Sequence, residues 1–219
     1  MLQALIFDMD GTLFQTDKIL ELSLDDTFDH LRSLQLWDTV TPIEKYREIM
    51  SVPLPKVWEA LLPEHSIEIR EQTDAYFLDR LIENIKSGKG ALYPNVKEIF
   101  IYIKENNCSI YIASNGLKEY LRAIVTYYAL DKWVTETFSI EQIQSLNKGD
   151  LVKRIMNKYD IKEAAVVGDR LSDINAAKDN SLLAIGCNFD FAQEEELAQA
   201  DIVIDDLIDL KRILPAVQR

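Results

Sequence analysis

Short apolar runs, each ending at a polar residue, recur along the chain and constrain its fold more than any other feature. The first run extends from Gln3 to Phe7 and is followed at once by Asp8. Four more runs occupy residues 109–113, 164–167, 182–185 and 202–204. Amphipathic stretches lie between them, and continuous apolar strands that alternate with helices are typical of a parallel sheet covered on both faces. We therefore expect an α/β fold.

Helical periodicity fills most of the remaining sequence. Apolar residues recur at three- and four-residue spacing in residues 117–128 and 151–156, which predicts two helices between the strands. The same periodicity occupies the region from Asp17 to about Ser87, where we find no strand signal. We expect an all-helical insertion at residues 17–87, in a core formed by residues 1–16 and 88–219.

The charge balance limits the partners that the chain can bind. It has 24 Lys and Arg against 37 Asp and Glu, a net charge of −13, and no basic stripe interrupts this excess. Such a surface repels polyphosphate backbones, so nucleic-acid binding is not expected. It also repels a small phosphate ester, so phosphate chemistry would need a metal ion and a well-placed lysine.

Cysteine content and hydropathy indicate the cellular compartment in which the protein is expected. The two cysteines, Cys108 and Cys187, are far apart and have neither disulfide-framework nor zinc-ligand spacing, which fits a reducing compartment. The N-terminal residues lack a basic leader, and apolar runs such as residues 99–103 are far too short to span a bilayer. We expect a cytoplasmic protein without a membrane partner.

The segment Asp8-Met9-Asp10-Gly11-Thr12 directly follows the first predicted strand. Two carboxylates at positions i and i+2 of a tight turn can divide the work of catalysis, since one can attack or bind metal while the other transfers a proton. The alternative is an Asp-rich turn that caps the next helix, with Gly11 supplying a positive φ.

A second acidic segment follows a later predicted strand. Asp169 comes directly after that strand and Asp173 lies four residues further on. Ligands of open α/β sheets bind at the carboxyl ends of the strands, and converging carboxylates there suit a hard cation such as Mg²⁺. For Asp173, a plain helix N-cap is the alternative.

Two further segments could hold an anion. Ser114-Asn115-Gly116 ends a predicted strand and opens a helix, so its hydroxyl and backbone N–H groups could bind phosphate, or could simply cap that helix. Lys148 lies before another predicted helix, where the helix dipole disfavours a cation unless an anion holds it there. The alternative for Lys148 is a solvated loop lysine.

In their order along the chain, the segments of Asp8 and Asp10, Ser114, Lys148, and Asp169 and Asp173 resemble the haloacid dehalogenase superfamily of phosphatases. The resemblance covers the whole predicted core, and the helical insertion is similar to the C1-type cap of phosphoglycolate phosphatases and β-phosphoglucomutases. It implies a Rossmann-like, three-layer core with a parallel sheet of five or six strands and an inserted all-helical cap.

The resemblance also implies chemical roles. Asp8 would attack phosphorus to form an aspartyl-phosphate, and Asp10 would protonate the leaving oxygen and then activate water. Mg²⁺ would be held by Asp8, the backbone carbonyl of Asp10 and Asp169, while Asp173 would ligate through water or orient Lys148. An acid at Asp10 favours a phosphatase or mutase over a dehalogenase.

The phosphate-binding groups implied by the same resemblance are Ser114, Asn115 and Lys148. Here the lysine lies in Asn-Lys-Gly-Asp, where many relatives have a longer Lys-Pro motif. In the insertion, we expect Arg47 and Lys56, which flank a turn at residues 53–55, to recognise the leaving group of the substrate. The alternative is that both are surface charges.

The predicted function is therefore Mg²⁺-dependent hydrolysis of a small phosphomonoester, such as phosphoglycolate, a sugar phosphate or a nucleotide, by a monomer or homodimer. A sugar phosphomutase of the β-phosphoglucomutase type is the first rival, because it would use the same core residues. The second rival is a binding module without turnover, which a complete set of catalytic groups disfavours.

Overall fold

The computed structural model describes residues 2–49, 54–190 and 192–217. The chain divides into two compact units, one formed by residues 1–15 and 91–219 and the other by residues 16–90. We call the larger the sheet unit. The smaller is the helical unit.

The sheet unit is built on six parallel strands in the order β3-β2-β1-β4-β5-β6. The strands are β1 (Ala4–Phe7), β2 (Ser109–Ser114), β3 (Val134–Ser139), β4 (Ala164–Gly168), β5 (Leu183–Cys187) and β6 (Ile202–Ile204). The first strand in the sequence is thus central in the sheet, between β2 and β4. Five of the six strands coincide, within two residues at each end, with the apolar runs of the sequence.

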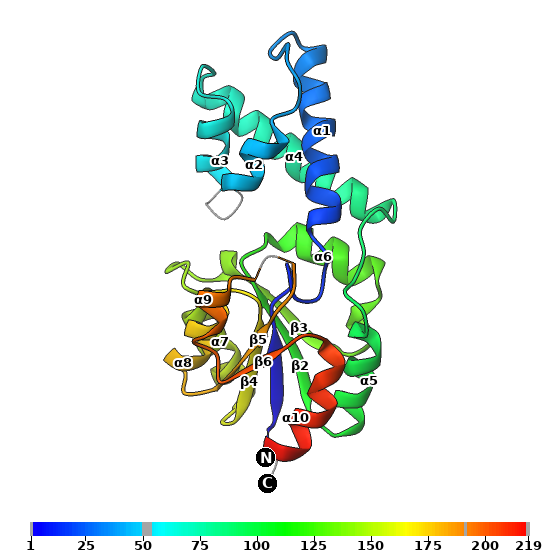
Figure 1. Cartoon of the computed structure of the whole chain (residues 1–219), viewed down its shortest axis with the longest axis vertical. Coiled ribbons are helices and arrows are strands. Elements are labelled where there is room, and N and C mark those ends of the chain that lie inside the picture. The colour runs from blue at the N-terminus through cyan, green and yellow to red at the C-terminus, as the bar shows by residue number, and fades with distance from the viewer. Residues whose placement is uncertain (1, 50–53, 191, 218–219) are drawn as a thin grey trace. The chain divides into compact units, whose positions relative to one another are not determined.

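Helices cover both faces of this sheet, as Figure 1 shows. The helices of the sheet unit are α5 (Val96–Glu105), α6 (Lys118–Tyr127), α7 (Lys148–Tyr159), α8 (Leu171–Asp179), α9 (Glu194–Leu197) and α10 (Leu210–Val217), with short 3₁₀ turns at Leu130–Lys132, Ile140–Gln142 and Leu207–Asp209. On one face, Ile6 and Val166 pack in a buried cluster with Leu151 of α7. On the other, the ring of Phe7 lies 5.3 Å from that of Phe100 in α5. The predicted three-layer α/β fold is confirmed.

The strand β3 was not predicted from the sequence. It lies at an edge of the sheet, and the middle of its sequence, Thr135 to Thr137, is polar and partly exposed. These polar residues interrupt the continuous apolar run by which the other five strands, including the second edge strand β6, could be recognised.

In the helical unit, the regular elements among the described residues are helices: α1 (Asp17–Ser33), α2 (Ile43–Ile49), α3 (Leu54–Leu61) and α4 (Ile67–Lys86). Phe77 of α4 is fully buried, and its ring lies 5.4 Å from that of Trp58 and 6.3 Å from that of Tyr46. The indole N–H of Trp58 donates to Asp74 at 2.6 Å, so the one polar group of this side chain is satisfied.

Strand register decides which residues meet at the carboxyl edge of the sheet. Phe7 pairs with Ile112 of β2 and with Val167 of β4, and the backbone N–H of Asp8 donates to Val167 at 2.9 Å. Polar residues that follow these three positions must therefore lie side by side. Among the described residues, no helix is long and apolar enough to cross a bilayer.

The two aromatic cores generate a stability prediction. Phe77→Ala in the helical unit and Phe100→Ala in the sheet unit each remove a fully buried ring. Each should lower the free energy of unfolding of its own unit by about 3–5 kcal/mol, through lost burial and the cavity that remains. Urea denaturation followed by circular dichroism measures this, and a loss under about 1 kcal/mol for either would contradict the packing described.

Candidate active site

The candidate site begins at the end of β1, where the chain turns sharply. Asp8 is buried, with 7% of its surface exposed, and its Oδ1 accepts a hydrogen bond from the backbone N–H of Met9 at 2.7 Å. Gly11 follows with φ of +75°, a conformation that side chains rarely adopt. A Cβ at Gly11 would lie 2.4 Å from Oδ2 of Asp169, so glycine is also needed for the close approach of the two loops.

A second loop, after β4, faces this turn. Asp169 is buried, and its Oδ1 accepts a hydrogen bond from the hydroxyl of Thr12 at 3.0 Å. Thr12 is a contact that sequence reasoning missed, although it belongs to the predicted nucleophile segment. Its bond ties the two loops together from positions 157 residues apart.

Lys148 joins the two loops electrostatically. It is the first residue of α7, and only 5% of its surface is exposed. Its Nζ lies 2.8 Å from Oδ1 of Asp8 and 2.5 Å from Oδ1 of Asp173. The alternative of a solvated loop lysine is therefore wrong, because two buried carboxylates hold this cation at the helix N-terminus. The adjacent N-cap is supplied by Asn147, whose side chain accepts from the N–H of Gly149 at 2.7 Å.

Asp173 lies in the first turn of α8 rather than at its N-cap, which is Arg170. Its Oδ2 accepts from the backbone N–H of Arg170 at 3.1 Å while its Oδ1 contacts Lys148. Asp173 thus stabilises the start of the helix and also holds the lysine. Gly168 makes this possible, since a Cβ there would lie 2.1 Å from Cγ of Asp173.

The segment after β2 has a different geometry from the one expected. Ser114 is the last residue of β2 and is buried, and its hydroxyl accepts from the backbone N–H of Gly116 at 3.0 Å. The helix α6 begins only at Lys118, and its N-cap is Leu117, so the idea that Ser114 is an N-cap is wrong. Asn115 is exposed at the carboxyl edge of the sheet.

Asp10 lies on the same turn as Asp8 but is half-buried. Its Oδ1 accepts a hydrogen bond from the hydroxyl of Tyr120 at 2.5 Å. Tyr120 belongs to α6, and no spacing in the sequence pointed to it. The helical period places it on the inward face of α6, where it reads as an ordinary core residue.

The carboxylates form a group with metal-ligand spacing. One oxygen from each of Asp8, Asp169 and Asp173 lies within 4.8 Å of the others. In the fully ionised form of this buried group, the single positive charge of Lys148 offsets only one of three negative charges. Burial and the neighbouring carboxylates raise the pKa of Asp169 to about 8 and that of Asp173 to about 6, and burial raises the pKa of Asp8. This donor set fits a hard divalent cation such as Mg²⁺.

Arg47 and Lys56 lie in the helical unit. Arg47 of α2 is exposed and contacts Glu21 at 2.5 Å and Glu44 at 2.7 Å, while the exposed Lys56 of α3 contacts Glu59 at 2.7 Å. The expected turn at residues 53–55 is wrong in part, because Leu54 and Pro55 lie in the first turn of α3, where proline is tolerated. Pro53 lies outside the described residues.

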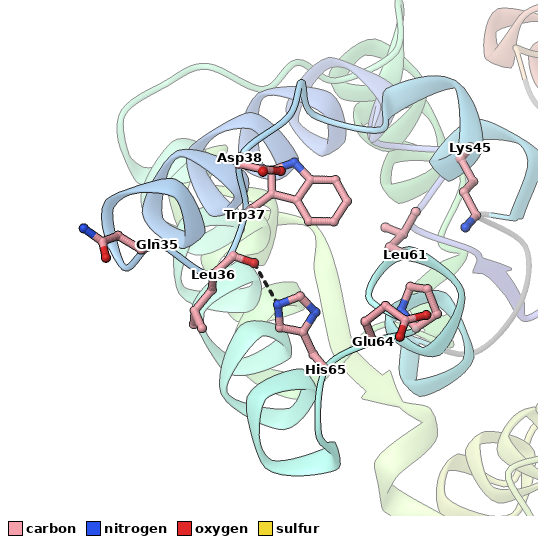
Figure 2. Close-up of a pocket in the computed structure, with 9 residues that line it drawn as sticks. Gln35, Leu36, Trp37, Asp38, Lys45, Leu61, Glu64 and His65 are labelled. Carbon is pink, nitrogen blue, oxygen red and sulfur yellow. Dashed lines mark hydrogen bonds between the residues drawn. The ribbon is translucent and has the colours of Figure 1, made fainter.

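A separate cavity of about 510 Å³ lies within the helical unit (Figure 2). Its walls are formed by residues 35–38, Lys45, Leu61 and residues 63–65. One ring nitrogen of His65, Nε2, lies 2.7 Å from the carbonyl oxygen of Leu36. None of the residues predicted for the site lines this cavity. The exposed lysine and the carboxylates among its lining residues do not form a recognisable catalytic group.

Comparison with known proteins agrees with this geometry. The chain is 23% identical over 221 residues to a phosphoglycolate phosphatase of Mannheimia succiniciproducens, and the match covers 95% of this chain and 96% of that relative. A predicted phosphoglycolate phosphatase from Haemophilus somnus has a similar structure, with a TM-score of 0.83, 20% identity and coverage of 97% and 98%.

The structure of CbbY from Rhodobacter sphaeroides in complex with phosphate is also similar, with a TM-score of 0.76, 19% identity and coverage of 96% of each chain. At these identities the structural likeness establishes the fold. The family model of the haloacid dehalogenase-like hydrolases matches residues 2–180. Because this match includes every strand end that contributes to the carboxylate group, and most of the chain, the protein belongs to the haloacid dehalogenase-like hydrolases.

Proposed function

We propose that the protein is a Mg²⁺-dependent phosphatase that hydrolyses a small phosphomonoester through an aspartyl-phosphate at Asp8. The observation that carries the proposal is the buried contact of Asp8 with Lys148, 2.8 Å long, at the edge of the sheet where Asp169 also directly follows a strand. Lys148 favours the anionic form of Asp8 that a nucleophile needs, and so opposes the burial that raises the pKa of this carboxyl group.

The chemistry begins with Asp8. An oxygen of its carboxylate forms a bond to phosphorus, and the bond from phosphorus to the ester oxygen breaks, with the electron pair going to that oxygen. Asp10 gives the ester oxygen a proton, so that an alcohol leaves. Water then attacks phosphorus while Asp10 takes a proton from it. The bond from phosphorus to the Asp8 oxygen breaks, with the electron pair going to that oxygen, so that inorganic phosphate is released and the Asp8 carboxylate is restored.

Three groups would bind the transferred phosphoryl oxygens. The ammonium of Lys148 supplies a buried positive charge next to the nucleophile, and the Ser114 hydroxyl lies in the neighbouring strand-end turn. Asn115, exposed beside it, offers an amide donor. Such prearranged donors stabilise the charge that develops on the equatorial oxygens.

Mg²⁺ would be held by Asp8, Asp169 and the backbone carbonyl of Asp10. When bound, the ion neutralises charge on the phosphoryl oxygens and offsets the repulsion among the carboxylates. Both oxygens of Asp173 already have partners, Lys148 and the N–H of Arg170, so this residue acts outside the direct ligands, by orienting the lysine.

The helical unit would act as the cap of the enzyme and contribute to substrate choice. Arg47 and Lys56 are our candidates for contact with the leaving group, since both are exposed. Their present partners are surface glutamates, and exposed pairs of this kind contribute only about 0–1 kcal/mol, so a substrate carboxylate could replace a glutamate at little cost.

The proposal is tested by measuring phosphate release, with Mg²⁺, from a panel that contains phosphoglycolate, sugar phosphates and nucleoside monophosphates. Wild type should turn over at least one ester without an activator, whereas Asp8→Asn should lose at least about a thousandfold in kcat, since an amide is not a nucleophile. Dependence on a sugar bisphosphate would identify a mutase. Near-normal rates for Asp8→Asn would rule out the covalent step.

Two matched variants test the metal assignment. Asp169→Ala should raise the Mg²⁺ concentration for half-maximal activity by about tenfold or more, because it removes a direct ligand. Asp173→Ala should raise that concentration much less and should instead lower kcat, because it releases Lys148. Equal effects of the two variants on the Mg²⁺ requirement would show that the roles are misassigned.

The raised pKa values predict how pH acts on stability and on Mg²⁺ binding. Asp169 and Asp173, with pKa values of about 8 and about 6, hold protons that the unfolded chain releases near its ordinary value of 3.8. Without metal, the folded state therefore binds more protons, and stability should fall as pH rises from about 4 to about 8. Mg²⁺ must displace the same protons.

The increase in melting temperature caused by Mg²⁺ should accordingly be larger at pH 8.5 than at pH 5.5. Thermal denaturation in EDTA and in excess Mg²⁺ at both pH values measures this difference. The control is the Asp169→Ala variant, measured in Ca²⁺-free buffer with Mg²⁺. An equal increase at both pH values would contradict the protonation states described.

A further inference from the structure

Tyr120 makes a contact with the nucleophile turn that neither the sequence nor the proposed function assigns. Its side chain, which is 6% exposed, comes from the first turn of α6, and its hydroxyl donates to Oδ1 of Asp10 at 2.5 Å. Figure 1 shows α6 beyond the carboxyl ends of the strands, the end of the sheet to which β1 delivers Asp10.

The ring of Tyr120 is itself held in place. A Cβ built at Gly116 would lie 3.2 Å from Cδ1 of Tyr120 and 3.2 Å from Oγ of Ser114. The phenol therefore packs closely against the backbone of the turn that presents Ser114. A ring fixed by its surroundings loses little further freedom when its hydroxyl forms a hydrogen bond.

We propose that Tyr120 is a positioning residue that orients the carboxyl group of Asp10 toward the leaving oxygen of the substrate. This role rests on the proposed function, in which Asp10 donates a proton to the leaving oxygen and later accepts one from water. Proton transfer needs the two heavy atoms within about 2.6–3.2 Å, so the rotation of the carboxyl group must be restricted.

The physical need arises from the position of Asp10. Unlike Asp8, it is only half-buried, so solvent competes for its oxygens. A short hydrogen bond from a buried phenol to one oxygen restricts the rotation of the carboxyl group. Tyr120 does not touch the reacting atoms in this scheme and acts only through Asp10.

The test compares Tyr120→Phe with Tyr127→Phe, which makes the same chemical change at an exposed position of the same helix. Two substrates are used: the alkyl phosphate that wild type hydrolyses fastest, and p-nitrophenyl phosphate, whose leaving group departs as a stable anion and needs little protonation. The value of kcat/KM is compared because it reports the steps through departure of the leaving group.

Tyr120→Phe should lower kcat/KM on the alkyl phosphate by about tenfold or more, part of the contribution typical of general acid catalysis, with little change in KM. On p-nitrophenyl phosphate the loss should stay below about threefold, and Tyr127→Phe should resemble wild type on both substrates. Equal losses on both substrates, or none on either, would overturn the positioning role. Inactivity of wild type on every ester would instead overturn the proposed function itself.

A double-variant comparison separates positioning from general support of the fold. In the background of Asp10→Asn, the further change Tyr120→Phe should have no effect on residual p-nitrophenyl phosphate or alkyl phosphate turnover, because the group through which it acts is gone. A loss in that background similar to the loss in wild type would show that Tyr120 acts independently of Asp10. Melting temperatures of all variants provide the check on folding.

Discussion

The buried ammonium of Lys148, shared between Asp8 and Asp173, is the interaction on which the rest of the site depends. Removing a carboxylate from water is unfavourable by several kcal/mol unless a partner compensates it. One cation placed between two carboxylates keeps both ionisable, and its own pKa is raised by them. It does not neutralise the whole group, and this deficit is what makes the place suitable for a divalent ion.

The backbone also helps to bring the carboxylates of the site together. Gly11 and Gly168 sit where any side chain would collide with Asp169 and Asp173, respectively. Their absence of a Cβ lets acidic side chains from different loops come close enough to share a cation. The site therefore requires residues that have no side chain as strictly as it requires the carboxylates.

The sequence predicted the elements whose physical signal is local. Five of the six strands could be found because each is an apolar run in the sequence, and this includes the partly exposed edge strand β6, whereas the middle of the edge strand β3 is polar. Of the site, the acidic pairs were predictable because each directly follows a strand. The partner of Asp10 was not, since Tyr120 lies 110 residues away and its contact depends on tertiary packing. Lys148 could be named from the sequence, but its burial could be learned only from the structure.

The central position of β1 has a consequence for how the chain folds during synthesis. Residues 4–7 are synthesised before residues 109–112 and 164–167, with which they pair. Contacts between residues so far apart in sequence form slowly, and an apolar strand without neighbours is prone to aggregate. The helical unit, residues 16–90, is continuous in sequence and is complete before either neighbour of β1 has been made. Its core can therefore form while β1 is still unpaired. The folded helical unit then shortens the effective loop between β1 and the strands with which it pairs later.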